Sequence, residues 1–300
     1  MTLISLLLTW AVIQLRGSVK VLQRDAWFLR WQSRLHGCQR LSNIDGGVLF
    51  VALVMPLLLL ALLSVLLVWK VSPLLIIFIN IPVLLYSFGR ADTQQNFSDY
   101  IAAWRRDDSA ACVNILLQID SELSLEALSA DTNSWAQLHR HALRTFAYSG
   151  FERMFAVLFW FLLLGAAGAL LYRLSSLFVQ SIDPHSDEQH LAAKWLWLLE
   201  WPAVRVLGLS LAMVGNFVGC FSLWREHLFC LRQSSAQMLL FSVQGALGLE
   251  AVSAEAEAAD SDVECAQVGC SGHQVEALQA LLSRALLLWV SAVALFTLFV

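Results

Sequence analysis

The stretch GGVLFVALVMPLLLLALLSVLLVW, residues 46–69, carries no charged side chain. An apolar helix of about 20 residues spans the roughly 30 Å hydrocarbon core of a bilayer, and a backbone in lipid must satisfy its own hydrogen bonds. This stretch is therefore expected to be a transmembrane helix. The composition agrees, because 58% of the 300 residues are hydrophobic and only 14% are charged, against about 25% charged in a soluble domain. We predict an all-α, polytopic membrane protein.

Further apolar runs follow the first one along the chain. When each run is counted as one crossing, the sequence predicts about five transmembrane helices, at 46–69, 71–88, 154–174, 202–223 and 284–300. The run at 154–174 contains Gly165 and Gly168, where a helix is easily interrupted. The alternative is four crossings and a re-entrant hairpin over 154–178. Small residues at Gly208, Gly215 and Gly219 predict close helix packing.

Positive charge predicts the orientation. Most Lys and Arg residues lie in the segments 1–45, 89–153 and 224–284, and cytoplasmic segments of membrane proteins are enriched in these residues. The sequence therefore predicts a multi-pass protein of a bacterial inner membrane with a cytoplasmic N-terminus. In the re-entrant alternative the segment 224–284 moves to the outside.

The crossings divide the chain into six regions. An N-terminal interfacial helix and basic segment precede two transmembrane helices, and a cytoplasmic helical insertion comes next. Two membrane segments joined by a polar loop are followed by an amphipathic helix with an acidic flexible loop (250–272) and by a last transmembrane helix. The expected boundaries are 1–45, 46–88, 89–153, 154–223, 224–283 and 284–300.

Motifs for cofactor chemistry are missing from the sequence. No lysine follows a glycine as in a phosphate-binding loop, so we expect no cofactor. Cys265, Cys270 and His273 fit no common zinc spacing, and we expect no metal. The basic residues of 16–40 lie beside an apolar segment, which favours anionic lipids rather than nucleic acid as their partner. The sequence leaves open whether the protein forms a homo-oligomer.

Charged side chains close to the apolar runs are the candidate ligand site. Arg144, Tyr148 and Glu152 follow one another at helical spacing, and Glu200 and Arg205 open a later membrane helix. Charges at such depth are paired or functional in most membrane proteins, although a snorkelling Arg205 is an equally good interpretation. The hairpin alternative adds Arg173, because it brings this residue, Glu152, Glu200 and Arg205 to one membrane face. Asp108 completes the set as a further carboxylate. No residue is assigned a catalytic role.

The chain resembles the AmpE family of inner-membrane proteins. The stretches that carry the resemblance occur in the family's order and are Gly89-Arg90, Tyr100–Ser109, Val157–Trp160, Gly165, Gly168–Arg173 and Glu200–Arg205. The resemblance implies a regulatory signalling modulator of β-lactamase induction, paired with the peptidoglycan-recycling amidase AmpD. It also implies a link to cell-wall recycling, to the response to β-lactam antibiotics and to a cell-wall-derived ligand.

The AmpE family is in turn similar to the CbiB/CobD membrane family, which forms an amide bond in cobalamin synthesis. The scaffold motifs agree, but positions that are polar in those relatives fall on Arg144, Tyr148-Ser149 and Glu152, and few of them are acidic here. A ligase that uses ATP needs carboxylates to hold Mg²⁺. We therefore expect a regulatory protein. The alternatives are a membrane-embedded CbiB-like amide-forming enzyme and a transporter partner that handles muropeptides.

Overall fold

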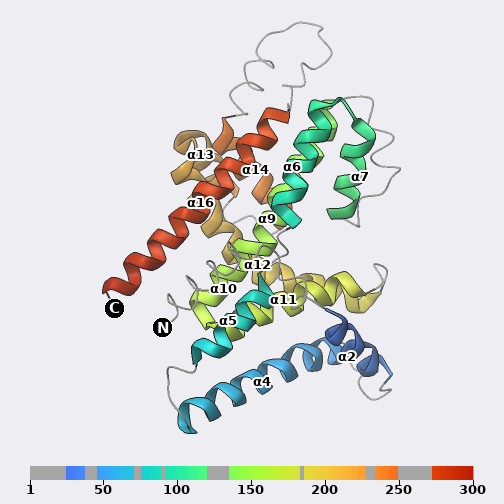
Figure 1. The fold of residues 1–300 in the computed structure, drawn as a ribbon, viewed down its shortest axis with the longest axis vertical. Helices are drawn as coiled ribbons and strands as arrows, with labels where there is room; N and C mark the ends of the chain where they lie inside the picture. Colours follow the sequence, from blue (N-terminus) through green and yellow to red (C-terminus); the bar gives the residue numbers. More distant parts are fainter. Residues whose placement is uncertain are drawn as a thin grey trace, which may run out of the picture. The chain divides into compact units, whose positions relative to one another are not determined.

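The computed structural model describes residues 25–37, 46–70, 76–88, 92–119, 135–182, 186–227, 234–248 and 272–299. Within these ranges almost every residue is helical and no strand occurs (Figure 1), which confirms the all-α prediction. The expected N-terminal interfacial helix and nearly all of the expected acidic loop lie outside the described residues. The chain forms two compact units, 1–91 with 152–203 and 92–151 with 204–300. We call them unit 1 and unit 2.

Unit 1 is built around α11 (Ala166–Ser181), which packs against α10 (Ala156–Leu164), α5 (Ile76–Ser87) and α4 (Gly47–Lys70). The short helix α2 (Ala26–His36) packs on α4. Buried apolar side chains from these helices and from α12 (Asp187–Val214) form one core: Phe28, Leu35, Val48, Ala52, Leu53, Leu170, Leu174, Leu177, Phe178 and Ala192. Large apolar side chains also remain exposed along α4, among them Phe50, Leu58, Leu59, Leu62 and Val65, as expected for a helix that faces lipid.

Unit 2 is built around α9 (Trp135–Gly150). This helix packs against α14 (Ser235–Leu247), α16 (Gly272–Phe299), α7 (Ser109–Ile119) and α6 (Asp92–Arg105). Aromatic side chains fill the contact with α6, where the rings of Phe97 and Phe146 stack with their centroids 4.1 Å apart. Helix α12 (Asp187–Val214) starts in unit 1 and ends in unit 2, and α13 (Phe217–His227) follows it.

Small residues bring three helices of unit 2 into close contact, as the sequence predicts. A Cβ added to Gly208 would lie 2.7 Å from the Trp224 ring, and one added to Gly215 would lie 2.7 Å from the carbonyl oxygen of Ala246. Gly245 is packed equally tightly, against the backbone of Cys220. These distances leave no room for a side chain, so the glycines determine how closely the end of α12, α13 and α14 approach one another.

Four helices in the described part of the chain are long and apolar enough to cross a membrane. They are Gly47–Val65, Leu138–Leu164, Asp187–Val214 and Gly272–Leu295. In the second of them, α9 continues without interruption through a π-helix, Phe151–Phe155, into α10. The expected crossing at 71–88 is described only as α5, which has 12 residues, and residues 71–75 before it lie outside the described ranges.

The chain turns at Gly165, where the sequence allowed either a crossing or a hairpin. Gly165 has φ 68° and ψ −152°, a conformation that only glycine adopts without strain. A Cβ on Gly168 would overlap the carbonyl group of Trp160, so α10 and α11 pack tightly against each other. The expectation of one continuous crossing over 154–174 is therefore wrong, because the glycines end one helix and start another.

Candidate functional site

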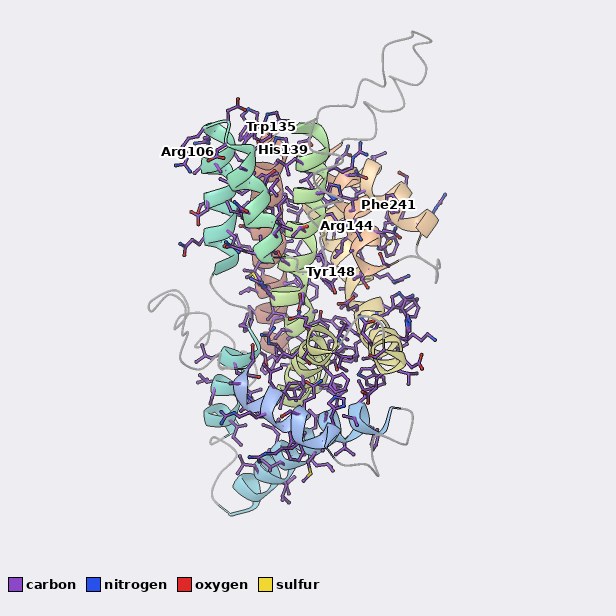
Figure 2. All side chains as sticks on the ribbon, turned by 90° about the vertical axis from the view of Figure 1, so that its right-hand side faces the viewer. Arg106, Trp135, His139, Arg144, Tyr148 and Phe241 are labelled. Carbon is purple, nitrogen blue, oxygen red and sulfur yellow. The ribbon has the colours of Figure 1, made fainter. Side chains whose placement is uncertain are left out.

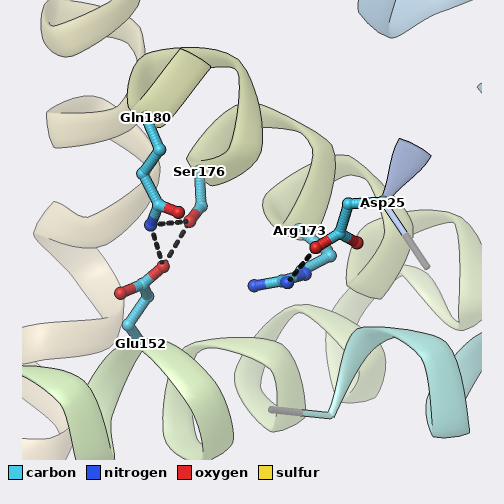
Figure 3. A network of polar contacts seen from close by, with 5 residues as sticks. All are labelled: Asp25, Glu152, Arg173, Ser176 and Gln180. Carbon is cyan, nitrogen blue, oxygen red and sulfur yellow. Dashed lines mark hydrogen bonds and ion pairs between the residues drawn. The ribbon is translucent and has the colours of Figure 1, made fainter. Parts of the chain in front are cut away.

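Glu152 comes from the π-helix at the end of α9 and contacts the side of α11. Its Oε1 accepts hydrogen bonds from the Ser176 hydroxyl and from the Gln180 amide, the latter over 3.0 Å (Figure 3). The Gln180 amide also lies 3.3 Å from the Ser176 hydroxyl. A π-turn inserts an extra residue into a helix and is frequent at functional sites. Here it places a carboxylate against two polar side chains of α11.

Arg173 lies on the same face of α11, one turn before Ser176. Its guanidinium contacts Asp25 at the start of α2, with Nη2 and Oδ2 3.3 Å apart (Figure 3). Both side chains are only 14% exposed. The Arg173 Nε is buried and makes no hydrogen bond with any residue that the structure describes. We call Asp25, Glu152, Arg173, Ser176 and Gln180 the α11 polar site.

A further carboxylate of unit 1 lies against another face of α11. Glu200 is 3% exposed, and its Oε1 accepts a hydrogen bond from the Tyr172 hydroxyl over 3.1 Å. One turn further along α11, Ser175 accepts a hydrogen bond from the Trp195 indole. A carboxylate buried this deeply needs such partners, because an ion without them is costly in an apolar environment. Helix α11 is thus lined by polar contacts on two faces.

The other four candidate residues belong to unit 2. Arg144 is exposed on α9, and Tyr148 follows it one turn later (Figure 2). Asp108 has a local role, because its Oδ1 accepts a hydrogen bond from the Ala111 amide over 2.9 Å and so caps α7. The carbonyl oxygen of Arg205 accepts a hydrogen bond from the Trp224 indole. The placement of Glu152 and Arg205 at one membrane face, which the hairpin alternative implies, stays a prediction.

The α11 polar site includes three residues that the sequence alone did not single out. Ser176 and Gln180 follow Arg173 at helical spacing, and this periodic polar face within an apolar segment is a signal that could have found them. Asp25 gives no such signal, because it is 148 positions away from Arg173 in the chain. Only the packing of α2 in unit 1 shows that the two residues pair.

The chemistry of the α11 polar site suits a polar organic ligand. Arg173 can donate to a carboxylate through two nitrogens at once, which is a geometry that a lysine does not offer. Glu152 accepts hydrogen bonds, and Ser176 and Gln180 both donate and accept them. The described residues contain no group of three His, Cys, Asp or Glu side chains placed to hold a metal ion.

Comparison with known proteins gives this chain a family. A model of the family described as "Regulatory signalling modulator protein AmpE" matches residues 1–290. The cobalamin biosynthesis protein CobD of Chromobacterium violaceum is 29% identical over 140 residues, which cover 44% of this chain and 45% of that protein. No solved structure matches. Since the family model covers nearly the whole sequence, the chain belongs to the AmpE family of regulatory signalling modulators, and its apolar helices make it a multi-pass membrane protein.

Proposed function

We propose that this protein is a regulator in the bacterial inner membrane that binds a cell-wall-derived ligand at the α11 polar site and thereby modulates β-lactamase induction. The α11 polar site carries the proposal. It combines an arginine whose buried Nε has no hydrogen-bond partner among the described residues, a carboxylate and two neutral polar side chains, in the same unit as the apolar core around α11. Polar groups of this kind within membrane helices mark ligand or ion sites by default. The regulatory description of the family supports the same function.

The ligand chemistry follows from the side chains. Fragments of peptidoglycan contain carboxylates, amides and hydroxyl groups. A ligand carboxylate would replace Asp25 as the partner of Arg173 and use the buried Nε as well, because guanidinium groups bind carboxylates through two parallel hydrogen bonds. Amide or hydroxyl groups of the ligand would donate to Glu152. Release of Asp25 would loosen the start of α2 from α11, so the ligand-bound protein would differ in conformation from the free protein.

The orientation belongs to the same proposal. With the N-terminus in the cytoplasm, the basic segment within residues 1–45 would contact anionic lipids of the inner leaflet, as its Lys and Arg content favours.

The experiment is an induction assay in a strain that lacks this gene and carries an inducible β-lactamase. The strain receives the wild-type protein, Arg173→Gln or Glu152→Gln, and β-lactamase activity is measured with and without a β-lactam inducer. Each variant removes one partner that the ligand needs, so we expect the wild-type effect on induction to fall about fivefold or more, the usual size of a ligand-linked coupling. Asp187→Asn serves as the matched control, because this exposed carboxylate also lies in unit 1 but outside the α11 polar site.

Two results would contradict the proposal. One is full wild-type modulation by both site variants when their amounts in the membrane equal that of the wild type. The other is an equal loss in the Asp187→Asn control, which would show that induction responds to any charge change in unit 1.

A second candidate function is a membrane-embedded amide-forming enzyme. The similarity to the CobD protein of Chromobacterium violaceum favours it. Calorimetry on the purified protein distinguishes the two functions, because a ligase that activates a carboxylate with ATP must bind the nucleotide with Mg²⁺. The regulatory proposal expects no micromolar ATP affinity, and a micromolar, Mg²⁺-dependent affinity would replace it with the enzyme.

A further inference from the structure

An open groove of about 630 Å³ lies in unit 2 between α6 and the first turns of α16. It is lined by Ser98, Ile101, Ala102, Arg105, Glu276 and Gln279. The groove has one positive and one negative side chain, and these form an ion pair with Arg105 Nη2 and Glu276 Oε1 2.6 Å apart. His273 Nδ1 lies 3.7 Å from the second oxygen of Glu276. None of these residues belongs to the α11 polar site.

The position of the groove along α16 places it at the level of the lipid headgroups. Helix α16 has 28 residues, which at 1.5 Å per residue is about 42 Å and matches a bilayer of about 40–45 Å with its headgroups. The hydrocarbon core takes up about 20 residues of this length. Since the C-terminal part of α16 is the apolar part, the first two turns with Glu276 and Gln279 extend into the headgroup layer.

The same face of α16 continues towards the membrane through the exposed Ser283, whose hydroxyl donates to the Gln279 carbonyl, to an apolar side chain. Leu287 follows Glu276 by about three helical turns, so both residues lie on one side of the helix. Leu287 is 57% exposed. An acyl chain that leaves the groove would pass Ser283, whose hydroxyl is already hydrogen-bonded to its own helix, and then lie against Leu287.

The charges of the groove select the headgroup. Arg105 is 66% exposed and Glu276 30% exposed, and an ion pair this accessible contributes little to stability and can open at small cost. Once open, it offers a guanidinium for a phosphate and a carboxylate for an ammonium group. A headgroup whose only charge is the negative phosphate would place that charge beside the negative carboxylate of Glu276, with no positive group to compensate it.

We propose that this groove binds a phospholipid with a phosphoethanolamine headgroup, whose phosphate contacts Arg105 and Gln279 and whose ammonium group contacts Glu276. The bound headgroup replaces the direct ion pair with two charge-assisted contacts. Its acyl chains follow the exposed face of α16.

Native mass spectrometry of the detergent-purified full-length protein tests the proposal. Phosphatidylethanolamine and phosphatidylglycerol are titrated separately, and we expect the wild type to bind the former about tenfold more tightly. Glu276→Gln should remove this preference by weakening phosphatidylethanolamine alone, whereas Arg105→Gln should weaken both lipids. Arg106→Gln is the matched control, because Arg106 is exposed beside the groove and its Nε donates to the Ala102 carbonyl instead. It should change neither affinity.

A steric variant tests the groove without removing a charge. Ala102 is exposed in the groove, so Ala102→Trp fills the space from the surface and should reduce binding of both lipids about tenfold while the helical circular dichroism stays that of the wild type. The proposal is wrong if the wild type shows no preference between the lipids, if Glu276→Gln weakens both equally, or if Ala102→Trp leaves phosphatidylethanolamine binding unchanged. The headgroup preference of the wild type decides the matter even if a variant fails to fold.

Discussion

Cys112 shows at the scale of one residue how unit 2 controls the chemistry of a side chain. The thiol is fully buried, and its sulfur lies 3.8 Å from the carbonyl oxygen of Tyr100. Burial, together with the nearby charge of Asp108, raises the pKa of the Cys112 thiol to about 11. The thiolate is the reactive form of cysteine, so Cys112 is held in its unreactive state at neutral pH.

We expect Cys112 to resist alkylation in the folded protein. At pH 8 its thiolate fraction should be about 100-fold below that of an unperturbed thiol with a pKa near 9, since each pKa unit is a factor of ten. Labelling with iodoacetamide followed by peptide mass spectrometry measures this, with the protein unfolded in sodium dodecyl sulfate and urea as the control. Rapid labelling of Cys112 before unfolding would contradict its burial.

The same pKa shift has a pH-dependent consequence for stability. The unfolded thiol ionises near pH 9, whereas the folded thiol stays neutral to about pH 11. Its contribution to stability is therefore fully present below about pH 9 and is lost as the pH rises towards 11. The Cys112→Ala variant has no thiol to ionise, so its stability should fall less than that of the wild type between about pH 9 and pH 11.

At the scale of the helices, the close approach of α13 and α14 depends on Gly245. A Cβ at this position would lie 2.7 Å from the Cys220 Cα and 3.0 Å from the carbonyl oxygen of Gly219. These are backbone atoms, which cannot move aside as the end of a side chain can. We expect Gly245→Ala to destabilise the protein by about 1–3 kcal/mol, the usual cost of overpacking.

Thermal unfolding in detergent, followed by circular dichroism, measures this cost as a lower midpoint. Gly37→Ala is the control, because Gly37 follows α2 with φ −70° and a Cβ there would have its nearest contact at 3.4 Å. A midpoint for Gly245→Ala as high as that of the control would show that the two helices can separate without loss.

The helices also show what could be predicted from the sequence and what could not. The apolar run at 46–69 and the small residues at Gly208 and Gly215 have local signals, and the structure confirms the helix and the close packing. The sequence offers the hairpin at Gly165 only as an alternative, because glycines are tolerated in a membrane helix. The backbone conformation of Gly165 and the packing of Gly168 on α10 decide for the turn. The pairing of Asp25 with Arg173 is a long-range contact without a periodic signal.

At the scale of the whole molecule, the ion pair between Arg105 and Glu276 constrains the topology. A contact of 2.6 Å between α6 and the start of α16 requires both to lie on one side of the membrane. The chain between them must therefore cross an even number of times. The candidate spans Leu138–Leu164 and Asp187–Val214 satisfy this requirement. We therefore expect the segments 89–153 and 224–283 to share a side. The turn at Gly165 is the one that the re-entrant alternative expects, but the span that ends there starts at Leu138, so the outside placement of 224–284 does not follow from the turn.

Reporter fusions test this topology. An alkaline phosphatase or green fluorescent protein fused after residue 130 should read cytoplasmic, as the positive charge of 89–153 predicts, and a fusion near residue 260 should give the same reading. A fusion near residue 40 controls for the N-terminal side. Opposite readings at 130 and 260 would contradict the contact between α6 and α16, and a periplasmic reading at 130 would reverse the orientation.

The discontinuity of unit 2 has a consequence for how the protein is made. The ion pair between Arg105 and Glu276 joins positions 171 residues apart, and a ribosome adds about 5–20 residues per second, so α6 leaves the ribosome roughly 10–30 s before its partner. Throughout that interval the face of α6 that α16 later covers has no partner from its own chain. Nascent chains arrested before residue 272 should therefore depend on insertases and membrane chaperones, and they should be degraded faster than the finished protein.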